Sequence, residues 1–499
     1  MNPLFLLFLL GLTTYFIVRG VSSVSRTPTW LLWLVAMMPA SIWIGWTLAN
    51  DKKTPPFYLI FIPLVVCLTL YFFLIQWGRI PTSEASSSAN RELGASLSEE
   101  GELPKEQASL RPIDQSEERY LQACFPWSIY YLQNLEYRPQ AVICRGHLKS
   151  QPEVAYQTIR ANVEEKFGDR FLVVFQEGVN GKPFFALVTN PHAKGTQSGQ
   201  STFNRPVIAL SLLAATFFTA CLAWLQIGGS SSGAGNFGQG FPISIIQGIP
   251  YAIALLTILG VHELAHYLAA RRHHIRTTLP YFIPVLPLPW FPFGTFGAFI
   301  QIRSPIPNRR ALFDVGISGP LVGFAVALPL LIWGLAHSTL VALPATSEFL
   351  NFQAFDPKFS LLLTILSKIT LGGTLTADTA LKMHPVAVAS SLGLIVTAFN
   401  LMPVGQLDGG HIVHAMLGQR MGAIVGQIAR LFLLVLSYWQ RYLLLWAIIL
   451  FLMPAMDEPA LNDVTELDNR RDLWGVVSLA LLLLIILPAP KFLTTLLNM

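Results

Sequence analysis

Charged residues are scarce in this chain. Only 12% of its 499 residues are Asp, Glu, Lys or Arg, about half the share found in a typical soluble domain. Hydrophobic residues make up 53%. A chain of this length has too few polar side chains to cover the surfaces of several soluble domains. The composition therefore predicts a polytopic α-helical membrane protein.

Sequence signatures of nucleotide and nucleic-acid binding are also missing. The chain has no P-loop, no GxGxxG motif and no stripe of basic and aromatic residues, so neither kind of partner is expected. The formal net charge is +5, but the Lys and Arg residues are dispersed between apolar stretches. This distribution indicates membrane topology rather than binding to nucleic acid.

Cysteine is rare, and no two cysteines form a CxxC motif. Of the four cysteines, Cys67 and Cys221 lie in apolar stretches, whereas Cys124 and Cys144 lie in a more polar region. Buried thiols are the favoured interpretation for all four. A disulfide between Cys124 and Cys144 stays open as an alternative.

Long apolar runs dominate the remainder. A helix that crosses a bilayer needs roughly 17–25 apolar residues. Such runs lie near 2–18, 30–49, 57–77, 206–226, 244–270, 311–336, 384–402 and 472–488. The stretch 421–455 is interrupted at Gln440 and Arg441 and forms one long span or two short ones, so we expect about eight to ten transmembrane helices. The first run lacks a basic n-region and is expected to be a retained helix. The run 359–372 is too short to cross and is expected to lie at the interface.

Composition divides the chain into four parts. Residues 80–113 are rich in Ser, Glu and Gly, which is typical of a flexible linker. In the segment that follows, 114–193, stretches with the composition of strands flank one with helical periodicity. They predict a leading helix followed by ββαββ, with Asn180-Gly181 as a hairpin turn. The predicted organisation is N-terminal transmembrane helices (1–78), linker (79–113), small α/β domain (114–193) and membrane domain (206–499) with its catalytic core at about 240–420.

The loop between the 244–270 and 311–336 spans carries most of the clustered arginines. Positive residues remain on the cytoplasmic side of a membrane. Counting back from this loop places the 114–193 domain on the cytoplasmic side as well. Lys52 and Lys53 oppose this topology, because it places them on the other side.

The sharpest motif is His262-Glu263-Leu264-Ala265-His266, near the end of an apolar helix. Two histidines four residues apart project from one helical face and can grip one metal ion. A catalytic zinc keeps one position open for water and lowers the pKa of that water from 15.7 towards about 7. Glu263 is placed to take the proton. Three ionisable groups in a membrane helix are costly unless they are paired or bound to metal.

A third ligand is expected from a later motif, Asn400-Leu-Met-Pro-Val-Gly-Gln-Leu-Asp408-Gly-Gly. Its Pro and Gly residues break the helix and allow close backbone approach, which leaves Asp408 as the candidate. An alternative for Asp408 is the N-cap of the helix that follows. Rival ligands are His411, His414 and Asp314. His273 and His274 are expected to be solvated at the membrane surface.

Together these two motifs resemble the site-2 protease family of intramembrane metalloproteases, in particular its cyanobacterial and chloroplast branch. The resemblance implies zinc ligands at His262, His266 and Asp408, a base at Glu263, and an orienting role for Asn400. It implies single-pass membrane proteins as substrates and a bacterial, cyanobacterial-type plasma or thylakoid membrane as the location. The segment Gly-His-Leu-Lys at 146–149 departs from the Gly-Asn-Leu-Arg that is usual in the family.

A protease must also bind an extended peptide. Five prolines between 280 and 292 forbid a regular helix, and residues 294–302 then have the composition of a strand. We expect a re-entrant loop whose edge strand pairs with the unwound substrate, with Gly294 and Gly297 among the binding residues. An ordinary hairpin at the membrane surface is the alternative.

The predicted function is therefore intramembrane peptide-bond hydrolysis by zinc-activated water, with the lipid bilayer as its medium. One alternative is a zinc-binding scaffold without proteolytic activity, which the intact Glu263 argues against. Another is an ion-coupled transporter, which the lack of an internal repeat argues against. The 114–193 domain is expected to filter substrates or to bind a regulatory partner.

Overall fold

The computed structural model describes residues 27–50, 112–138, 140–178, 181–190, 206–228, 241–287, 291–344 and 351–499, with scattered positions at 11–18 and 56–74. The chain divides into two compact units, 1–105 and 106–499. In the first unit, α2 (Thr29–Ala49) is long and apolar enough to cross a membrane. The predicted spans near 2–18 and 57–77 fall largely outside the described residues.

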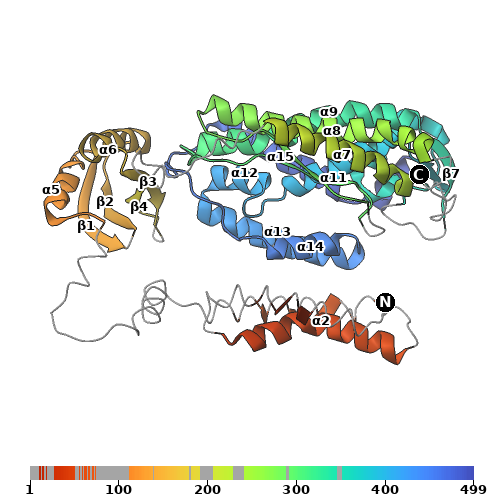
Figure 1. Cartoon of the computed structure of the whole chain (residues 1–499), viewed down its shortest axis with the longest axis horizontal. Helices are drawn as coiled ribbons and strands as arrows, with labels where there is room; N and C mark the ends of the chain where they lie inside the picture. The colour runs from red at the N-terminus through yellow and green to blue at the C-terminus, as the bar shows by residue number, and fades with distance from the viewer. Residues whose placement is uncertain are drawn as a thin grey trace. The chain divides into compact units, whose positions relative to one another are not determined.

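The second unit begins with a small α/β domain (Figure 1). Its elements are α5 (Gln115–Ala123), β1 (Tyr130–Arg138), β2 (Ala141–Leu148), α6 (Pro152–Phe167), β3 (Phe171–Glu177) and β4 (Pro183–Thr189). This order confirms the predicted leading helix and ββαββ pattern. The four strands form an antiparallel sheet in the order β1-β2-β4-β3. In the predicted turn, Gly181 has a φ of 71°, whereas Val179 and Asn180 lie outside the described residues.

Aromatic side chains fill the core of this domain. The Phe175 ring stacks on Phe185 with centroids 4.1 Å apart, and Tyr130 meets Phe185 edge-on at 5.0 Å. Gly146 lets β1 approach closely, because a Cβ there would lie 2.1 Å from the Tyr131 carbonyl oxygen. Cys144 is buried in the core as a free thiol, as are the three other cysteines elsewhere in the chain. The disulfide alternative is therefore wrong, and burial raises the pKa of the Cys144 thiol.

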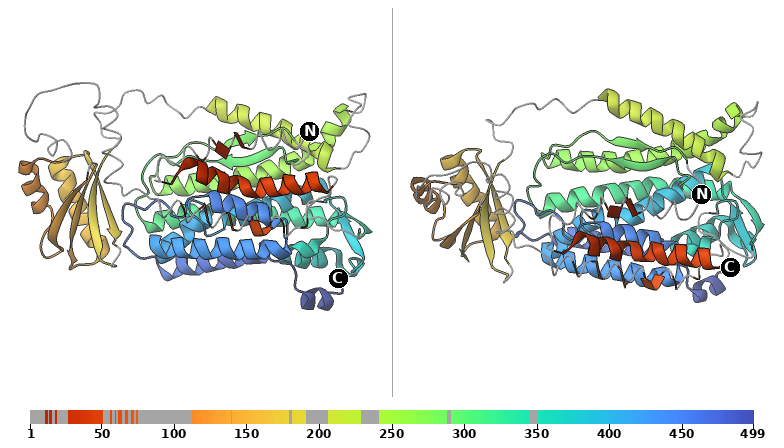
Figure 2. Two further views of the ribbon diagram at one scale, coloured as in Figure 1. Left: turned by 90° about the horizontal axis from the view of Figure 1, so that it is seen from below. Right: turned by 60° about the horizontal axis from the view of Figure 1, so that its bottom comes forward.

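Helices make up most of the rest of the second unit (Figures 1 and 2). They are α7 (Pro206–Ile227), α8 (Phe241–Arg272), α9 (Arg309–Ala336), α10 (Leu361–Leu371), α11 (Pro385–Asn400), α12 (Asp408–Leu417), α13 (Gln419–Trp439), α14 (Leu443–Leu452), α15 (Asn469–Ile486) and α16 (Lys491–Leu496). Helices α8, α9 and α11 pack against one another in the centre of this bundle.

Five helices among the described residues are long and apolar enough to span a membrane: α2, α7, α8, α9 and α13. The run predicted at 384–402 forms α11, which is shorter. The 421–455 stretch is broken after Trp439, so it forms two helices rather than one long span. The run predicted at 472–488 forms α15, which begins with Asn469-Arg-Arg-Asp472. With these charges in its first turn, α15 is not among the five helices. Helix α10 is short, in keeping with the interfacial helix expected there.

Two short β-ribbons interrupt the helices. Strands β5 (Tyr281–Pro284) and β6 (Thr295–Phe299) pair antiparallel between α8 and α9. This confirms a strand in the predicted region, although it ends at Phe299 rather than at 302. Strands β7 (Thr339–Ala342) and β8 (Thr379–Lys382) form the second ribbon, between α9 and α11.

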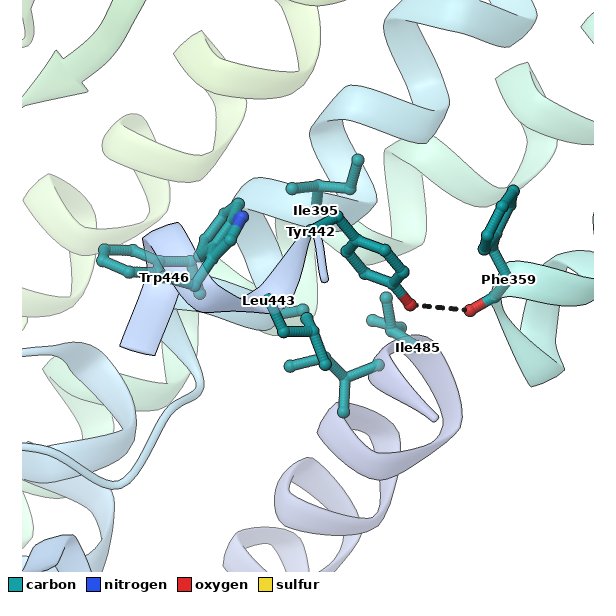
Figure 3. A pocket seen from close by; sticks show the side chains of 9 residues that line it. Phe359, Ile395, Tyr442, Leu443, Trp446 and Ile485 are labelled. Atoms are coloured by element: carbon teal, nitrogen blue, oxygen red, sulfur yellow. Dashed lines mark hydrogen bonds between the residues drawn. The ribbon is translucent and has the colours of Figure 1, made fainter. Parts of the chain in front are cut away.

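A separate apolar pocket lies among α11, α14 and α15. Figure 3 shows Ile395, Leu443, Trp446 and Ile485 around it, with the Tyr442 hydroxyl directed at the Phe359 carbonyl, 3.3 Å away. No ionisable acid or histidine lines this pocket. Its lining is apolar and aromatic, with the Tyr442 hydroxyl as its one polar side-chain group apart from the Trp446 indole.

Candidate metal centre

Helix α8 presents both histidines of the HELAH motif to the bundle interior. One turn separates them, so their rings lie together, with His262 Nε2 and His266 Nε2 3.1 Å apart. His262, Glu263 and His266 are all buried. The His266 Nδ1 donates a hydrogen bond to the Val315 carbonyl oxygen at 2.7 Å, which fixes the ring with its Nε2 towards His262.

Helix α9 makes room for the two imidazoles with glycine. A Cβ at Gly319 would lie 2.1 Å from His266 Nε2, and one at Gly323 would lie 3.1 Å from His262 Nδ1. Small residues four apart let two membrane helices approach closely. Here that approach places α9 directly against the ring atoms of the metal-binding face.

Asp408 completes the cluster from α12. Its Oδ2 lies 3.5 Å from His262 Nε2 and 3.3 Å from His266 Nε2. Two glycines allow this helix to start where it does, because a Cβ at Gly409 would meet the Leu401 carbonyl oxygen at 2.0 Å and one at Gly410 would meet the Gly405 oxygen at 2.1 Å. The N-cap is Leu407, and it makes no side-chain capping bond. The N-cap alternative for Asp408 is therefore wrong.

Asn400, at the end of α11, also faces this cluster. Its Nδ2 lies 3.2 Å from His262 Nε2. The structure thus brings together His262, His266, Asp408 and Asn400 from three helices, with Glu263 lining the same cavity.

The rival ligands have other partners. Asp314 accepts two hydrogen bonds from Arg471, each 2.7 Å long, and lies 2.9 Å from His273 Nε2. His273 therefore has an ion-pair partner at a partly exposed position, and His274 is exposed. His411 lines the cavity, but its Nδ1 pairs with Asp457 at 2.8 Å, as does that of His414.

Strand β6 brings backbone to the same cavity. Ala298, Phe299 and Ile300 line it, whereas the two glycines singled out in the sequence do not. Gly294 has a φ of 81° and packs against α7, where a Cβ would lie 2.6 Å from the Thr219 carbonyl oxygen. Gly297 has a φ of 106° and open space where a Cβ would be.

The donor set fits a catalytic metal ion. One ligand atom from each of His262, His266 and Asp408 lies within 4.8 Å of the others. Two imidazole nitrogens and a carboxylate are the protein ligands of many catalytic zinc sites, which leave the fourth position to water. Without a metal ion, burying two imidazoles in a membrane helix costs free energy.

Some residues of this centre escaped the sequence analysis. The Gly319-x-x-x-Gly323 spacing was visible in the chain but could not be matched to its histidine partners. Asp457 and Asp463 lie between the predicted runs at 421–455 and 472–488, where no motif marks them as partners of a histidine. Their partners on α12 lie more than forty residues away in sequence.

Comparison with known proteins agrees with this geometry. Residues 250–438 match the model of Peptidase family M50. The chain contains a Peptidase family M50 domain. The matched residues include the HELAH motif of α8 and Asp408 of α12, and the match confirms the site-2 protease resemblance. Residues 119–195, which include most of the α/β domain, match the EGY3 middle domain.

The M50 domain also has named plant relatives. The "Probable zinc metalloprotease EGY2, chloroplastic" of Oryza sativa subsp. indica is 29% identical over 372 residues, 73% of this chain and 65% of that protein. The "Probable zinc metalloprotease EGY1, chloroplastic" of Arabidopsis thaliana is 33% identical over 241 residues, 48% of this chain and 43% of that protein. The chain thus spans just under two thirds of the first relative's length. No solved structure matches.

Proposed function

We propose that this chain is an intramembrane zinc metalloprotease that cuts single-pass membrane proteins in or near their transmembrane segments. The observation that carries the proposal is the convergence of His262, His266 and Asp408 beside Glu263. Two of the helices that surround this cluster, α8 and α9, are long and apolar enough to cross a membrane. The M50 match and the zinc metalloprotease names of the relatives support the same activity.

The ligands for zinc would be His262, His266 and Asp408. Bound there, zinc would supply Lewis acidity and lower the pKa of a water molecule towards about 7. Glu263 follows the first ligand directly and lines the cavity, so it is the group that accepts the proton of the attacking water. Asn400 donates toward the cluster from α11 and would orient His262 or the peptide carbonyl.

Strand β6 would hold the peptide during cleavage. A transmembrane substrate helix hides its amides and must unwind before it can be cut. Ala298 and Phe299 at the end of β6, and Ile300 just after it, line the cavity, so an unwound segment that enters the cavity would lie beside this strand and could add to it. In this proposal Gly294 seats the hairpin on α7, and Gly297 keeps its outer face open.

The location follows from charge and from one set of contacts. Arginines flank the ends of α8 and α9 that face the metal centre, so we place this side in the cytoplasm of a cyanobacterial-type cell, at a plasma or thylakoid membrane. The α/β domain is hydrogen-bonded to 461–463, which pairs with 306–307 just before α9. We therefore place it on the same side. The two plant relatives are named as chloroplastic proteins.

Glu263→Gln is the decisive variant for the reaction. We expect it to retain about one zinc, because the ligands are intact, and to lose cleavage by at least about 100-fold, the scale of general base catalysis. Cleavage of a tagged single-pass substrate in detergent and elemental analysis measure the two quantities. Glu165→Gln, on the exposed surface of α6, is the matched control and should cleave normally.

The outcomes separate the competing functions. Zinc in both proteins with cleavage only by the wild type supports the protease. Zinc in both with equal cleavage removes Glu263 as the base. Zinc without any cleavage of a panel of single-pass substrates favours the scaffold, and lack of zinc in the wild type favours the transporter.

Substrate pairing with β6 is tested separately by Gly297→Trp. A bulky side chain in the open space beside the strand should weaken substrate binding and raise KM about tenfold or more, with zinc content unchanged. Gly372→Trp is the control, because Gly372 also combines a positive φ with open space where a Cβ would be, but it caps the C-terminus of α10; it reports the effect of the backbone strain that any side chain meets at such a position. Normal cleavage by Gly297→Trp would sink the strand-pairing proposal.

A further inference from the structure

Residues 453–464, called here the connecting segment, lie between α14 and α15 and support α12 from behind. Asp457 Oδ2 accepts hydrogen bonds from His411 Nδ1 and His414 Nδ1, both at 2.8 Å. His414 Nε2 lies 3.0 Å from Asp463 Oδ1. His414 is thus held between two carboxylates, and all three side chains are buried.

This cluster is bonded to α12, the helix that begins with the third candidate metal ligand, Asp408. His411 and His414 lie three and six residues after Asp408, on a helix that ends at Leu417. Its first residue is therefore within two turns of both anchored histidines. Through His411 and His414, Asp457 is thus bonded to the helix whose first residue is Asp408.

Further bonds fix the connecting segment near the loop that leads into Asp408. Arg430, buried on α13, donates to the Met453 and Pro454 carbonyl oxygens at 3.0 and 2.7 Å. The Pro454 carbonyl lies against Gly405, where a Cβ would be 2.3 Å away. Gln419 donates to the Asp457 carbonyl at 2.8 Å.

The other end of the connecting segment is part of the α/β domain. The Phe175 N–H donates to the Leu461 carbonyl at 2.7 Å, and the Asp463 N–H donates to the Phe175 carbonyl at 2.9 Å. This parallel pairing covers β3, which is an edge strand of the sheet. The Val464 side chain is buried in the same core as Phe175 and Phe185.

The same short stretch also touches the start of α9. Leu461 N–H donates to the Ile306 carbonyl at 2.9 Å, and Arg309 Nε donates to Asp463 Oδ1 at 3.2 Å. Asp463 is therefore shared between α9, the α/β domain and α12. Buried carboxylates of this kind hold their geometry through their partners, because loss of one partner leaves an uncompensated charge.

We infer that the connecting segment couples the α/β domain to the metal centre. In this arrangement Asp457 and Asp463 are positioning residues that set the Asp408 carboxylate through α12, and β3 anchors the segment that carries them. A metal ligand must be held within about 0.5 Å of its working geometry by the groups behind it. The inference rests on the proposed function, since it requires zinc at His262, His266 and Asp408.

The test measures zinc retention of the purified full-length chain against a competing chelator. Asp457→Asn should lower zinc affinity about tenfold or more, which is the usual effect of groups that orient metal ligands. Val464→Asp, which expels the segment from the α/β core but keeps both positioning carboxylates, should lower it about threefold or more. Asp468→Asn is the control, because Asp468 caps α15 and pairs with Arg471; it should bind zinc as the wild type does.

A spectroscopic readout distinguishes positioning from loss of fold. With Co²⁺ in place of zinc, the visible absorption of the folded fraction should shift in Asp457→Asn and Val464→Asp, and Asp457→Glu should restore most of the wild-type spectrum. Size-exclusion profiles select the folded fraction, and Val464→Ala replaces Val464→Asp if the latter does not fold.

Wild-type affinity and spectra in either Asp457→Asn or the Val464 variant would overturn the coupling. Weakened zinc binding in Asp468→Asn to the same degree would overturn it too, because the effect would then belong to the whole loop. A wild type that binds no zinc refutes the proposed function instead.

Discussion

The bundle and the α/β domain bury their interiors in opposite ways. At the metal centre, α8 and α12 bury imidazoles and carboxylates, and α9 faces them with glycine. In the α/β domain, the core contains stacked aromatic rings and the free thiols of Cys124 and Cys144. Among the described residues, the cluster of acids and histidines able to hold a metal ion lies in the bundle.

This difference separates the site from its support. Burying ionisable groups costs several kcal/mol each unless they are paired or bound to metal. In the bundle these groups are therefore clustered at the candidate metal centre and the partners behind it. The α/β domain buries apolar area, which stabilises a fold without doing chemistry. Its contribution to the site passes through a few backbone bonds between β3 and the connecting segment.

Among the substitutions that test this contrast between the bundle and the α/β domain, one at Gly319 is expected to have the largest effect. Gly319→Val places a side chain where a Cβ already lies 2.1 Å from His266 Nε2, so zinc should fall well below one per chain and cleavage should be lost. Elemental analysis of the folded fraction measures this. Gly45→Val, on a membrane-length helix with open space at that position, should leave zinc unchanged, and full zinc in Gly319→Val would contradict the packing of α9 on the histidines.

A second substitution probes the opposite region. Phe185→Ala removes the ring that stacks on Phe175 and should lower the stability of the α/β domain by about 3–5 kcal/mol. Hydrogen exchange of the strands in the full-length protein reports this loss. As long as the domain stays folded, zinc content should not change.

The neighbouring Phe184 provides the control for that experiment. Its ring lies under the Arg145 guanidinium, 5.5 Å from the ring centroid, at a partly exposed position. Phe184→Ala should cost only about 1 kcal/mol, the scale of an exposed cation–π contact. Equal losses at the two positions would mean that the aromatic core does not dominate stability.

The smallest expected effect is a dependence of stability on pH. Burial lowers the pKa of His414, but hydrogen bonds with Asp457 and Asp463 outweigh burial and raise the pKa to about 9. A raised pKa stabilises the fold fully below about 6.5, the ordinary value of His, and this contribution is lost as pH rises through about 9. The thermal midpoint of the purified protein should fall across that range.

His414→Gln should flatten this decline. Asp457, whose pKa its two histidine partners lower to about 2 against the effect of burial, stays ionised throughout the range. An equal slope in wild type and variant would assign the decline to other groups.

Several features followed from local sequence. The HELAH spacing places two imidazoles on one face of any helix, whatever packs against it. The leading helix and the ββαββ order within 114–193 also followed from local sequence, and the structure has that order. The choice among Asp408, Asp314, His411 and His414 could not be made in this way, because each residue type can bind a metal ion.

The sequence by itself determined the membrane class, the helix face that carries both histidines and the α/β order, because hydrophobicity and residue spacing act over a few turns of chain. Only the tertiary structure decided which carboxylate joins His262 and His266. It pairs Asp314 with Arg471 and His411 with Asp457, and it leaves Asp408 at the cluster. The physical reason is that each buried ionisable group needs a partner, and those partners come from segments far apart in the chain.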